Sequence, residues 1–204
     1  MTDTSTPDPW HLRPPLRWDG GTGFGPYIDA LRDLQDLVGS TNPPADVLEA
    51  ATQRVAELTE LLRQYRCGEV DLIPGRRHDL PGRGHPLLPA TVYTEVGDHH
   101  VVGRVRFGQY YLGGNGAVHG GALPLLFDEV LGHLCNLGGR KVARTAYLHV
   151  NYRSITPVDA DLVIHARIER EEGRKRFITG RLLHGDTLCS DAEGLFVGLL
   201  PGQP

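Results

Sequence analysis

One stretch near the middle of the chain restricts the fold more than any other. A glycine-rich segment, residues 113–121, leads directly into a strongly apolar run that continues to residue 136. This run is too long for a strand, and as a helix it would be apolar on nearly every side. Such a pattern predicts a helix buried inside a domain. Pro124 fits the first turn of that helix, where its missing N–H group has no partner to lose.

Two features of this stretch indicate chemistry. Asp128 and Glu129 interrupt the apolar run, and a carboxylate withdrawn from water is costly unless it is paired, hydrogen-bonded or neutralised. At the helix start, adjacent glycines allow a ligand to approach the backbone, and the first N–H groups offer donors and a positive dipole end. Donors at the helix start and an acid two turns along are expected to form an active site.

The residues of this stretch resemble a known family. The segment Val118-His119-Gly120-Gly121-Ala122, followed by Asp128 nine positions after the histidine, is similar to the motif of hotdog-fold acyl-CoA thioesterases. The resemblance is to the mammalian carboxyl-terminal-modulator-type and bacterial phenylacetate-type enzymes, and it continues through 145–153, 172–175 and 192–196. It covers roughly the second half of the chain. It implies an α+β hotdog fold, in which an antiparallel sheet wraps a long central helix.

The resemblance also implies an activity and a set of catalytic roles. The reaction is hydrolysis of an acyl-CoA thioester to a free acid and coenzyme A. The backbone N–H of Gly120 would polarise the thioester carbonyl, and Asp128 would act as general base or as nucleophile. Thr145 would help to hold water or the acid, and His119 would shape the loop or contact the thioester. In the family's dimers the acid reaches the active site of the neighbouring subunit, so a homodimer or a dimer of dimers is expected.

The expected substrate-binding residues are Gly121, Asn115, Asn151, Arg153, Arg174 and Lys175. The coenzyme A phosphates require basic side chains near the cleft. The alternative for the three basic residues is that they are solvated charges on strands and turns. Asn115 is a loop residue that can adopt a left-handed conformation. The chain departs from the family pattern at residues 153–155, which read Arg-Ser-Ile in place of a basic-basic-Pro run.

Other interpretations of the same residues remain open. Asp128 could be a structural acid, and Glu129 is expected to be structural, at a dimer contact for example. A non-catalytic acyl-CoA-binding or protein-interaction module on the same scaffold is the alternative function. Hydration or dehydration of acyl thioesters requires other spacings, and His133 stands where one such subgroup has Glu. Gly113 stands where another thioesterase subgroup has a catalytic Asn.

The rest of the chain divides into segments of different character. Residues 1–25 are expected to be irregular, and their glycines lack the Lys-Ser/Thr ending of a phosphate-binding loop. Residues 26–68 predict two amphipathic helices, the first capped by Gly39 and the second ending at Gly68. They are expected to pack on the main domain, or to form a lid or a partner surface. A linker at 69–85 then leads into the thioesterase domain, 86–204, with strands at 89–96 and 101–107 and further strands after the central helix.

Composition excludes several other classes of protein. A formal charge of −4 and a pI near 6.2 give no reason to expect nucleic acid or an anionic membrane as a partner. The three scattered cysteines argue against a disulfide framework or a zinc site, and the histidines lack metal-ligand spacing. No metal or cofactor is expected besides the coenzyme A of the substrate. No segment predicts a membrane span or a signal peptide, so the expected location is the cytoplasm.

Overall fold

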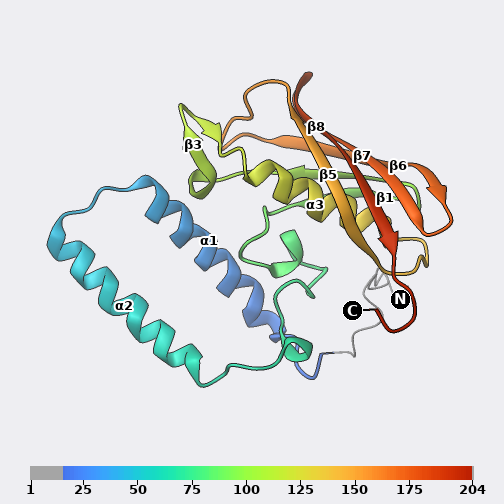
Figure 1. The fold of residues 1–204 in the computed structure, drawn as a ribbon. Helices are drawn as coiled ribbons and strands as arrows, with labels where there is room; N and C mark the ends of the chain where they lie inside the picture. The colour runs from blue at the N-terminus through green and yellow to red at the C-terminus, as the bar shows by residue number, and fades with distance from the viewer. Residues whose placement is uncertain (1–15, 204) are drawn as a thin grey trace.

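The computed structural model describes residues 16–203 (Figure 1). The first 15 residues of the predicted irregular segment, including the stretch judged not to be a signal peptide, lie outside this range. The helices are α1 (Phe24–Ser40), α2 (Ala45–Arg63) and α3 (Ala122–Cys135). The strands are β1 (Val92–Val96), β2 (His100–Val105), β3 (Leu112–Gly114), β4 (Ala117–Val118), β5 (Ala143–Tyr152), β6 (Leu162–Glu172), β7 (Lys175–His184) and β8 (Thr187–Gly198).

A six-stranded antiparallel sheet, in the order β1-β2-β6-β7-β8-β5, wraps α3 (Figure 1). This is the hotdog arrangement that the resemblance implied. Strands β6, β7 and β8 are joined as consecutive hairpins. Strand β5 precedes β6 in the sequence but pairs with β8, at the other side of these hairpins. That crossover leaves β5 as one edge of the sheet and β1 as the other.

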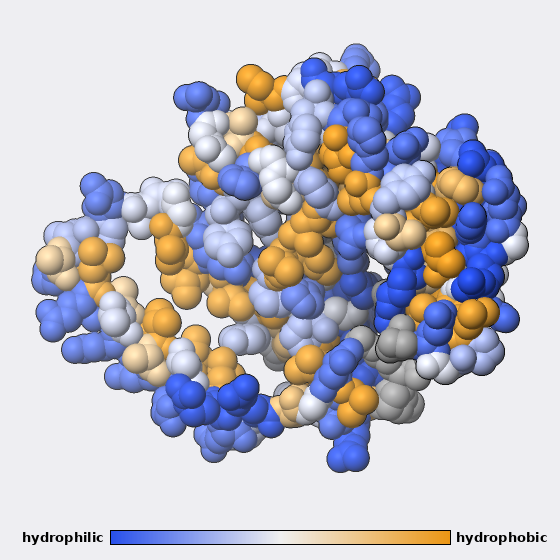
Figure 2. Space-filling model, viewed as in Figure 1, coloured by the Kyte–Doolittle hydropathy of each residue, from blue (hydrophilic) through white to orange (hydrophobic). Residues whose placement is uncertain are grey.

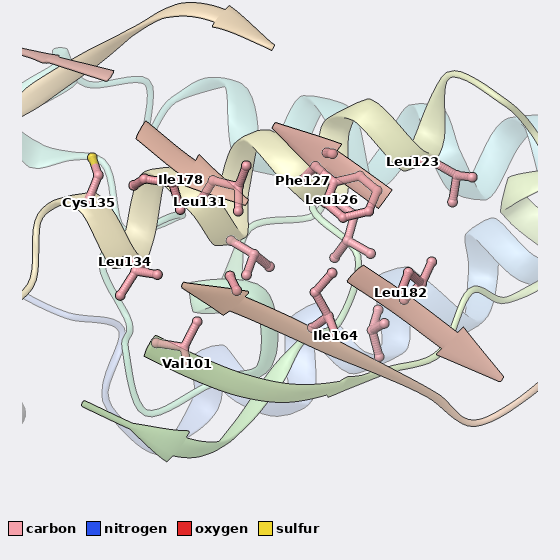
Figure 3. Close-up of a cluster of buried hydrophobic side chains, with 14 of the residues drawn as sticks. Val101, Leu123, Leu126, Phe127, Leu131, Leu134, Cys135, Ile164, Ile178 and Leu182 are labelled. Carbon is pink, nitrogen blue, oxygen red and sulfur yellow. The ribbon is translucent and has the colours of Figure 1, made fainter. Parts of the chain in front are cut away.

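The core lies between α3 and the inner face of the sheet (Figure 3). Fully buried helix residues recur every three or four positions, so one face of α3 meets the sheet. Gly180 on β7 permits this close approach, because a Cβ there would lie 3.0 Å from the Phe127 ring. The buried core residues shared by α3 and the strands include Leu123, Leu126, Phe127, Val130, Leu131, Leu134, Val101, Leu162, Ile164, Ile178, Leu182 and Phe196.

Two buried polar side chains fix the carboxyl end of α3. Asn136 donates from Nδ2 to the Gly132 carbonyl at 2.8 Å, and its Oδ1 accepts from the Ala143 N–H at 2.9 Å. Arg176, on β7, donates from Nη1 to the Cys135 carbonyl at 2.7 Å. The last carbonyls of a helix have no partner within the helix and carry the negative end of its dipole, so both contacts stabilise this end. They also hold α3 in a fixed position against β5 and β7.

Helix α1 packs on the domain, whereas α2 does not. Gly39 lies inside the last turn of α1 and is not its cap as predicted. A Cβ there would lie 3.1 Å from the Gln109 carbonyl oxygen, so this glycine serves the contact of α1 with a 3-10 turn, Gln109–Tyr111. Helix α2 ends at Arg63, earlier than the predicted Gly68, and none of its residues is buried. The prediction that both helices pack on the main domain is therefore wrong for α2.

Candidate active site

A two-residue hairpin presents the glycine-rich loop. Asn115 and Gly116 both have positive φ, 50° and 73°, as a type I′ turn between β3 and β4 requires. The left-handed conformation expected at Asn115 is confirmed. Val118 is anchored by its N–H, which donates to the Thr156 carbonyl at 2.8 Å. The hairpin therefore fixes the chain just before it enters the helix.

His119 is held by backbone contacts on both sides. Its N–H donates to the Tyr111 carbonyl at 2.7 Å, and its Nδ1 accepts from the Gly121 N–H at 3.0 Å. Since Nδ1 is an acceptor, a neutral ring carries its proton on Nε2. A Cβ at Gly113 would lie only 2.7 Å from the His119 Cα, so the chain cannot place an asparagine there without moving this loop. Loop architecture is thus a definite part of the role of His119.

The backbone N–H of Gly120, just before the amino end of α3, is a free donor in the described part of the chain. Gly121 precedes the first helical residue, Ala122, and its N–H is occupied by His119. The N–H of Gly120 has no acceptor among residues 16–203. The carbonyl of Gly120 accepts from the Tyr152 hydroxyl at 2.9 Å, so the end of β5 orients this peptide. Tyr152 belongs to the segment 145–153 that resembles the family, but no feature of the sequence alone indicated this contact.

Asp128 and Thr145 are brought together as predicted. The Thr145 hydroxyl donates to Asp128 Oδ1 at 2.8 Å, joining the middle of α3 to the beginning of β5. Asp128 lies beside the edge strand β5, which does not cover it, so this carboxylate is exposed in a single chain. The expectation that the apolar helix encloses Asp128 is therefore wrong for one protomer, because the sheet covers only one face of the helix.

Glu129 is the carboxylate that is withdrawn from water. Its two oxygens accept from Arg83 Nε and Nη2, each at 2.7 Å, and the two side chains are only 12% and 18% exposed. Arg83 has a φ of 54°, and its Nη1 also donates to the Gly75 carbonyl at 2.9 Å. This pair ties residues 69–91, which we call the strap, to α3. The structural role expected for Glu129 agrees with this contact, and the predicted linker is folded against the domain.

The Arg83–Glu129 pair separates two hollows. On one side, a pocket of about 250 Å³ contains Asp128 and Thr145. On the other, a cavity of about 350 Å³ lies between the strap, β1 and α3. Tyr93 and His133 stack in its wall with ring centroids 4.4 Å apart. Burial raises the pKa of Tyr93, whose hydroxyl has no partner among the described residues, and lowers the pKa of His133 to about 4, with His78 and Arg83 adding to the effect.

The low pKa of His133 predicts a loss of stability in mild acid. In the unfolded chain this histidine has an ordinary pKa near 6.5. Between pH 6.5 and 4 the side chain is therefore protonated in the unfolded state but neutral in the folded state. The free energy of unfolding should fall as the pH drops from about 6.5 to 4, by on the order of 3 kcal/mol from this group. Urea denaturation at several pH values between 4 and 6.5 measures this change in the free energy of unfolding. His133→Phe, which keeps a ring stacked on Tyr93, should flatten this pH dependence, and His184→Gln at the exposed end of β7 should leave it unchanged.

The expected substrate-binding residues fall into two groups. Asn151 and Arg153 lie at the end of β5, where both donate to Asp191, at 2.8 Å from Asn151 Nδ2 and 2.5 Å from Arg153 Nε. The Arg153 hydrogen bond is the main reason why the pKa of Asp191 is lowered. Arg174 and Lys175 lie at the opposite end of the sheet, where Arg174 donates to the Gly198 carbonyl at 2.8 Å. Asp191 was not predicted, because its partners come from another strand.

The donor and the acid of one chain are too far apart to act on one carbonyl. Gly121 and Asp128 are separated by seven residues of helix, and at 1.5 Å per residue this is roughly 10 Å. A carbonyl carbon and its oxygen must lie within about 3 Å of the catalytic groups. The free Gly120 donor and the Asp128 carboxylate of one chain therefore cannot act on the same carbonyl group. Within residues 16–203, no group of three metal-ligating side chains is assembled, and no helix is long and apolar enough to cross a membrane.

The fold and this site define a hotdog domain with a glycine loop at the start of its helix and an acid at the centre. The family model described as "Thioesterase superfamily" matches residues 115–189. A crystal structure of a thioesterase superfamily protein superposes with a TM-score of 0.75 at 28% identity, over 87% of this chain and 96% of that one. The central part of the chain is therefore similar in sequence to this superfamily, and the whole fold is similar to that of one of its solved members.

Two curated relatives and one further structure add detail. The acyl-coenzyme A thioesterase THEM4 of Bos taurus is 36% identical over 96 residues, 46% of this chain and 39% of the relative. That of Mus musculus is 32% identical over 117 residues, 56% of this chain and 50% of the relative. The chain thus spans half or less of these relatives. A Streptococcus mutans protein solved with acetyl CoA shares the fold, with a TM-score of 0.51 at 16% identity over 53% of this chain and 88% of that one.

Proposed function

We propose that this protein hydrolyses acyl-CoA thioesters to a free acid and coenzyme A. The observation that carries the proposal is the Thr145–Asp128 hydrogen bond, which holds an exposed carboxylate on the same helix whose start offers the free Gly120 N–H. The family model matches residues 115–189, which hold these groups, and two similar curated proteins are named acyl-coenzyme A thioesterase. Their names support the choice of a coenzyme A thioester as substrate.

The complete site forms between two copies of the chain. Strand β5 is an exposed edge, with Asp128 beside its beginning at Thr145 and Gly120 beside its end at Tyr152. Edge strands tend to be covered, and two identical strands related by a two-fold axis pair antiparallel. Such pairing places the beginning of one β5 opposite the end of the other. The acid of one copy then meets the free donor of the second, which removes the separation of roughly 10 Å within a chain.

In this arrangement the carbonyl oxygen of the thioester accepts a hydrogen bond from the Gly120 N–H at the positive end of α3. Asp128 of the other copy either takes a proton from a water molecule, whose oxygen attacks the carbonyl carbon, or attacks that carbon itself. The C–S bond then breaks, and the coenzyme A sulfur leaves and takes up a proton. If Asp128 attacks, a mixed anhydride forms, and water hydrolyses it in a second step.

The remaining residues are assigned to substrate binding. Gly121 and Asn115 border the loop that faces the thioester. Two-fold pairing brings the end of the sheet that carries Arg174 and Lys175 toward the Asn151 and Arg153 end of the second copy, where basic groups would meet the coenzyme A phosphates. Asp191 already neutralises part of the charge of Arg153, so Arg174 and Lys175 are expected to contribute more to binding.

Thiol release from a panel of acyl-CoAs tests the function. The panel should contain short, long, branched and aromatic acyl groups, with the released coenzyme A detected by a thiol reagent and binding measured by calorimetry on the same protein. Turnover of at least one member is expected. Tight binding of several members with no thiol release would contradict the hydrolase and favour the acyl-CoA-binding module. Failure to bind any of them would contradict both.

A further inference from the structure

Helix α2 carries an apolar stripe that the rest of the chain leaves uncovered. The residues Leu48, Ala51, Val55, Leu58 and Leu62 are spaced by three and four positions in alternation, and all are exposed. This is the spacing of a helix that packs along a seam against another helix. Tyr65 continues the spacing in the turn that follows α2, and the charged residues of α2 all lie off the seam.

Helix α1 carries a second stripe of the same kind. Tyr27, Leu31, Leu34 and Val38 are spaced by four, three and four positions on the side that faces away from the domain. The opposite side of α1 is the one that contacts the domain, through Arg32 and Asp36 for example. A four-residue seam on α1 and a five-residue seam on α2 thus lie on one helical arm, which we define as residues 24–65.

The two helices do not cover each other. The space-filling view shows an opening between α1 and α2, and hydrophobic residues gather along its borders (Figure 2). Seven large apolar side chains on α2 and the following turn, and four on α1, are left exposed: Val47, Leu48, Val55, Leu58, Leu61, Leu62, Tyr65, Tyr27, Leu34, Leu37 and Val38. At roughly 100 Å² for each, these eleven present on the order of 1,000 Å², more than the largest apolar patch of a typical monomer.

A helix in this position needs a partner. Most helices in proteins owe their stability to packing of an apolar face more than to the helix propensity of their residues. Helix α2 has 19 residues and no buried side chain. The exposed apolar area of the arm is close to the roughly 800 Å² that each partner contributes to a stable protein–protein interface. The solved superfamily structure that matches 87% of this chain must share part of this arm, since the residues outside 24–65 are under four fifths of the chain.

We infer that the arm binds the same arm of a second copy of this chain, forming an antiparallel four-helix bundle from two α1 and two α2 helices. The α2 seam is self-complementary in that arrangement. With the two-fold axis between Ala56 and Glu57, Val55 of each copy lies opposite Leu58 of the other, and the small Ala51 lies opposite the larger Leu62. An identical arm supplies the same area and the same spacing, so it fills the opening between α1 and α2. This contact is independent of β5 pairing and of the proposed hydrolase activity.

Cross-linking of the full chain tests the inference directly. In a Cys67→Ser background the two remaining cysteines are buried, so a single new cysteine can be addressed. Val55→Cys, on the seam, should give a covalent dimer with a short bismaleimide linker at micromolar protein. The matched variant Gln53→Cys, on the exposed polar side of α2, should give at least tenfold less. Equal yields from the two positions, or no covalent dimer from Val55→Cys, would overturn the inference, the latter showing that α2 closes on its own chain or awaits another partner.

A second pair of variants separates the seam from general effects of charge. In the Val55→Cys, Cys67→Ser chain, Leu58→Glu places a carboxylate on the seam, whereas Gln64→Glu adds the same charge off the seam. The covalent dimer should be lost with Leu58→Glu and retained with Gln64→Glu. Retention in both would overturn the assigned register. Because the readout is a covalent product, it does not change if β5 pairing joins the same two copies.

Discussion

Asp128→Asn is expected to lower the turnover number for acyl-CoA hydrolysis by about 10³–10⁴-fold while leaving substrate affinity within about twofold. Asparagine keeps the size of the side chain and an oxygen that can accept from the Thr145 hydroxyl, now found 2.8 Å from Asp128. It cannot take a proton from water or form an anhydride. Initial rates of thiol release at saturating acyl-CoA measure the loss, and calorimetry measures the affinity.

Two comparisons make this prediction specific. Asp186→Asn changes an exposed carboxylate in the turn between β7 and β8 in the same way and should leave turnover unchanged. Thr145→Val, which removes the hydroxyl that orients Asp128, should lower turnover by about tenfold and leave the fold intact. Full turnover in Asp128→Asn would show that Asp128 is a structural and not a catalytic residue.

Mixing of variants tests whether the site is shared between copies. Gly120→Pro removes the free N–H and should be inactive by itself, and Asp128→Asn should be nearly inactive. In a mixed dimer one site combines the intact loop of one copy with the intact acid of the other. Random mixing should therefore restore about one quarter of wild-type activity, since half of the dimers are mixed and each has one complete site. No recovery, with mixed dimers demonstrated by mass, would show that both groups act within one chain.

The second large effect is expected from the Arg83–Glu129 pair. Glu129→Gln should lower the free energy of unfolding by about 2–4 kcal/mol, because it leaves the Arg83 guanidinium, only 18% exposed, without its countercharge. The strap should detach from α3 as a result, since Arg83 joins Glu129 to the Gly75 carbonyl. Urea unfolding measures the loss of stability, and hydrogen exchange of residues 69–91 measures the release of the strap.

The control is the same substitution in an exposed pair. Arg170 Nε lies 2.8 Å from Glu172, with both side chains more than half exposed, and Glu172→Gln should change the unfolding free energy by less than about 1 kcal/mol. Replacing both partners, as Arg83→Met with Glu129→Leu, should recover more than half of the loss, because no charge is then left buried. If Glu129→Gln and Glu172→Gln had equal effects, the pair would have no special part in holding the strap.

Local patterns were sufficient to predict much of this fold. The length and hydrophobicity of residues 122–135 predicted the central helix, and turn residues such as Glu172-Gly173 and Gly185-Asp186 marked the strands that follow it. The predicted strand at 89–96 begins earlier than β1, and the predicted strand at 101–107 ends later than β2, because the pairing of β2 with β6 ends at Val105. Apolar residues continue beyond that point, since Phe107 is still in the core.

The sequence by itself determined the groups of the candidate site: a glycine loop at a helix start, an acid nine residues after the histidine, and Thr145 on the next strand. Their chemistry depends on residue type and spacing, which the sequence contains. Only the tertiary structure decided which carboxylate is buried, since that depends on which face of α3 the sheet and the strap cover. It also decided that the Gly121 N–H is occupied while that of Gly120 is free, that Tyr152 contacts Gly120, that Asp191 contacts Asn151 and Arg153, and that no residue of α2 is buried. These are contacts between segments distant in sequence, and periodicity within one segment carries no information about them.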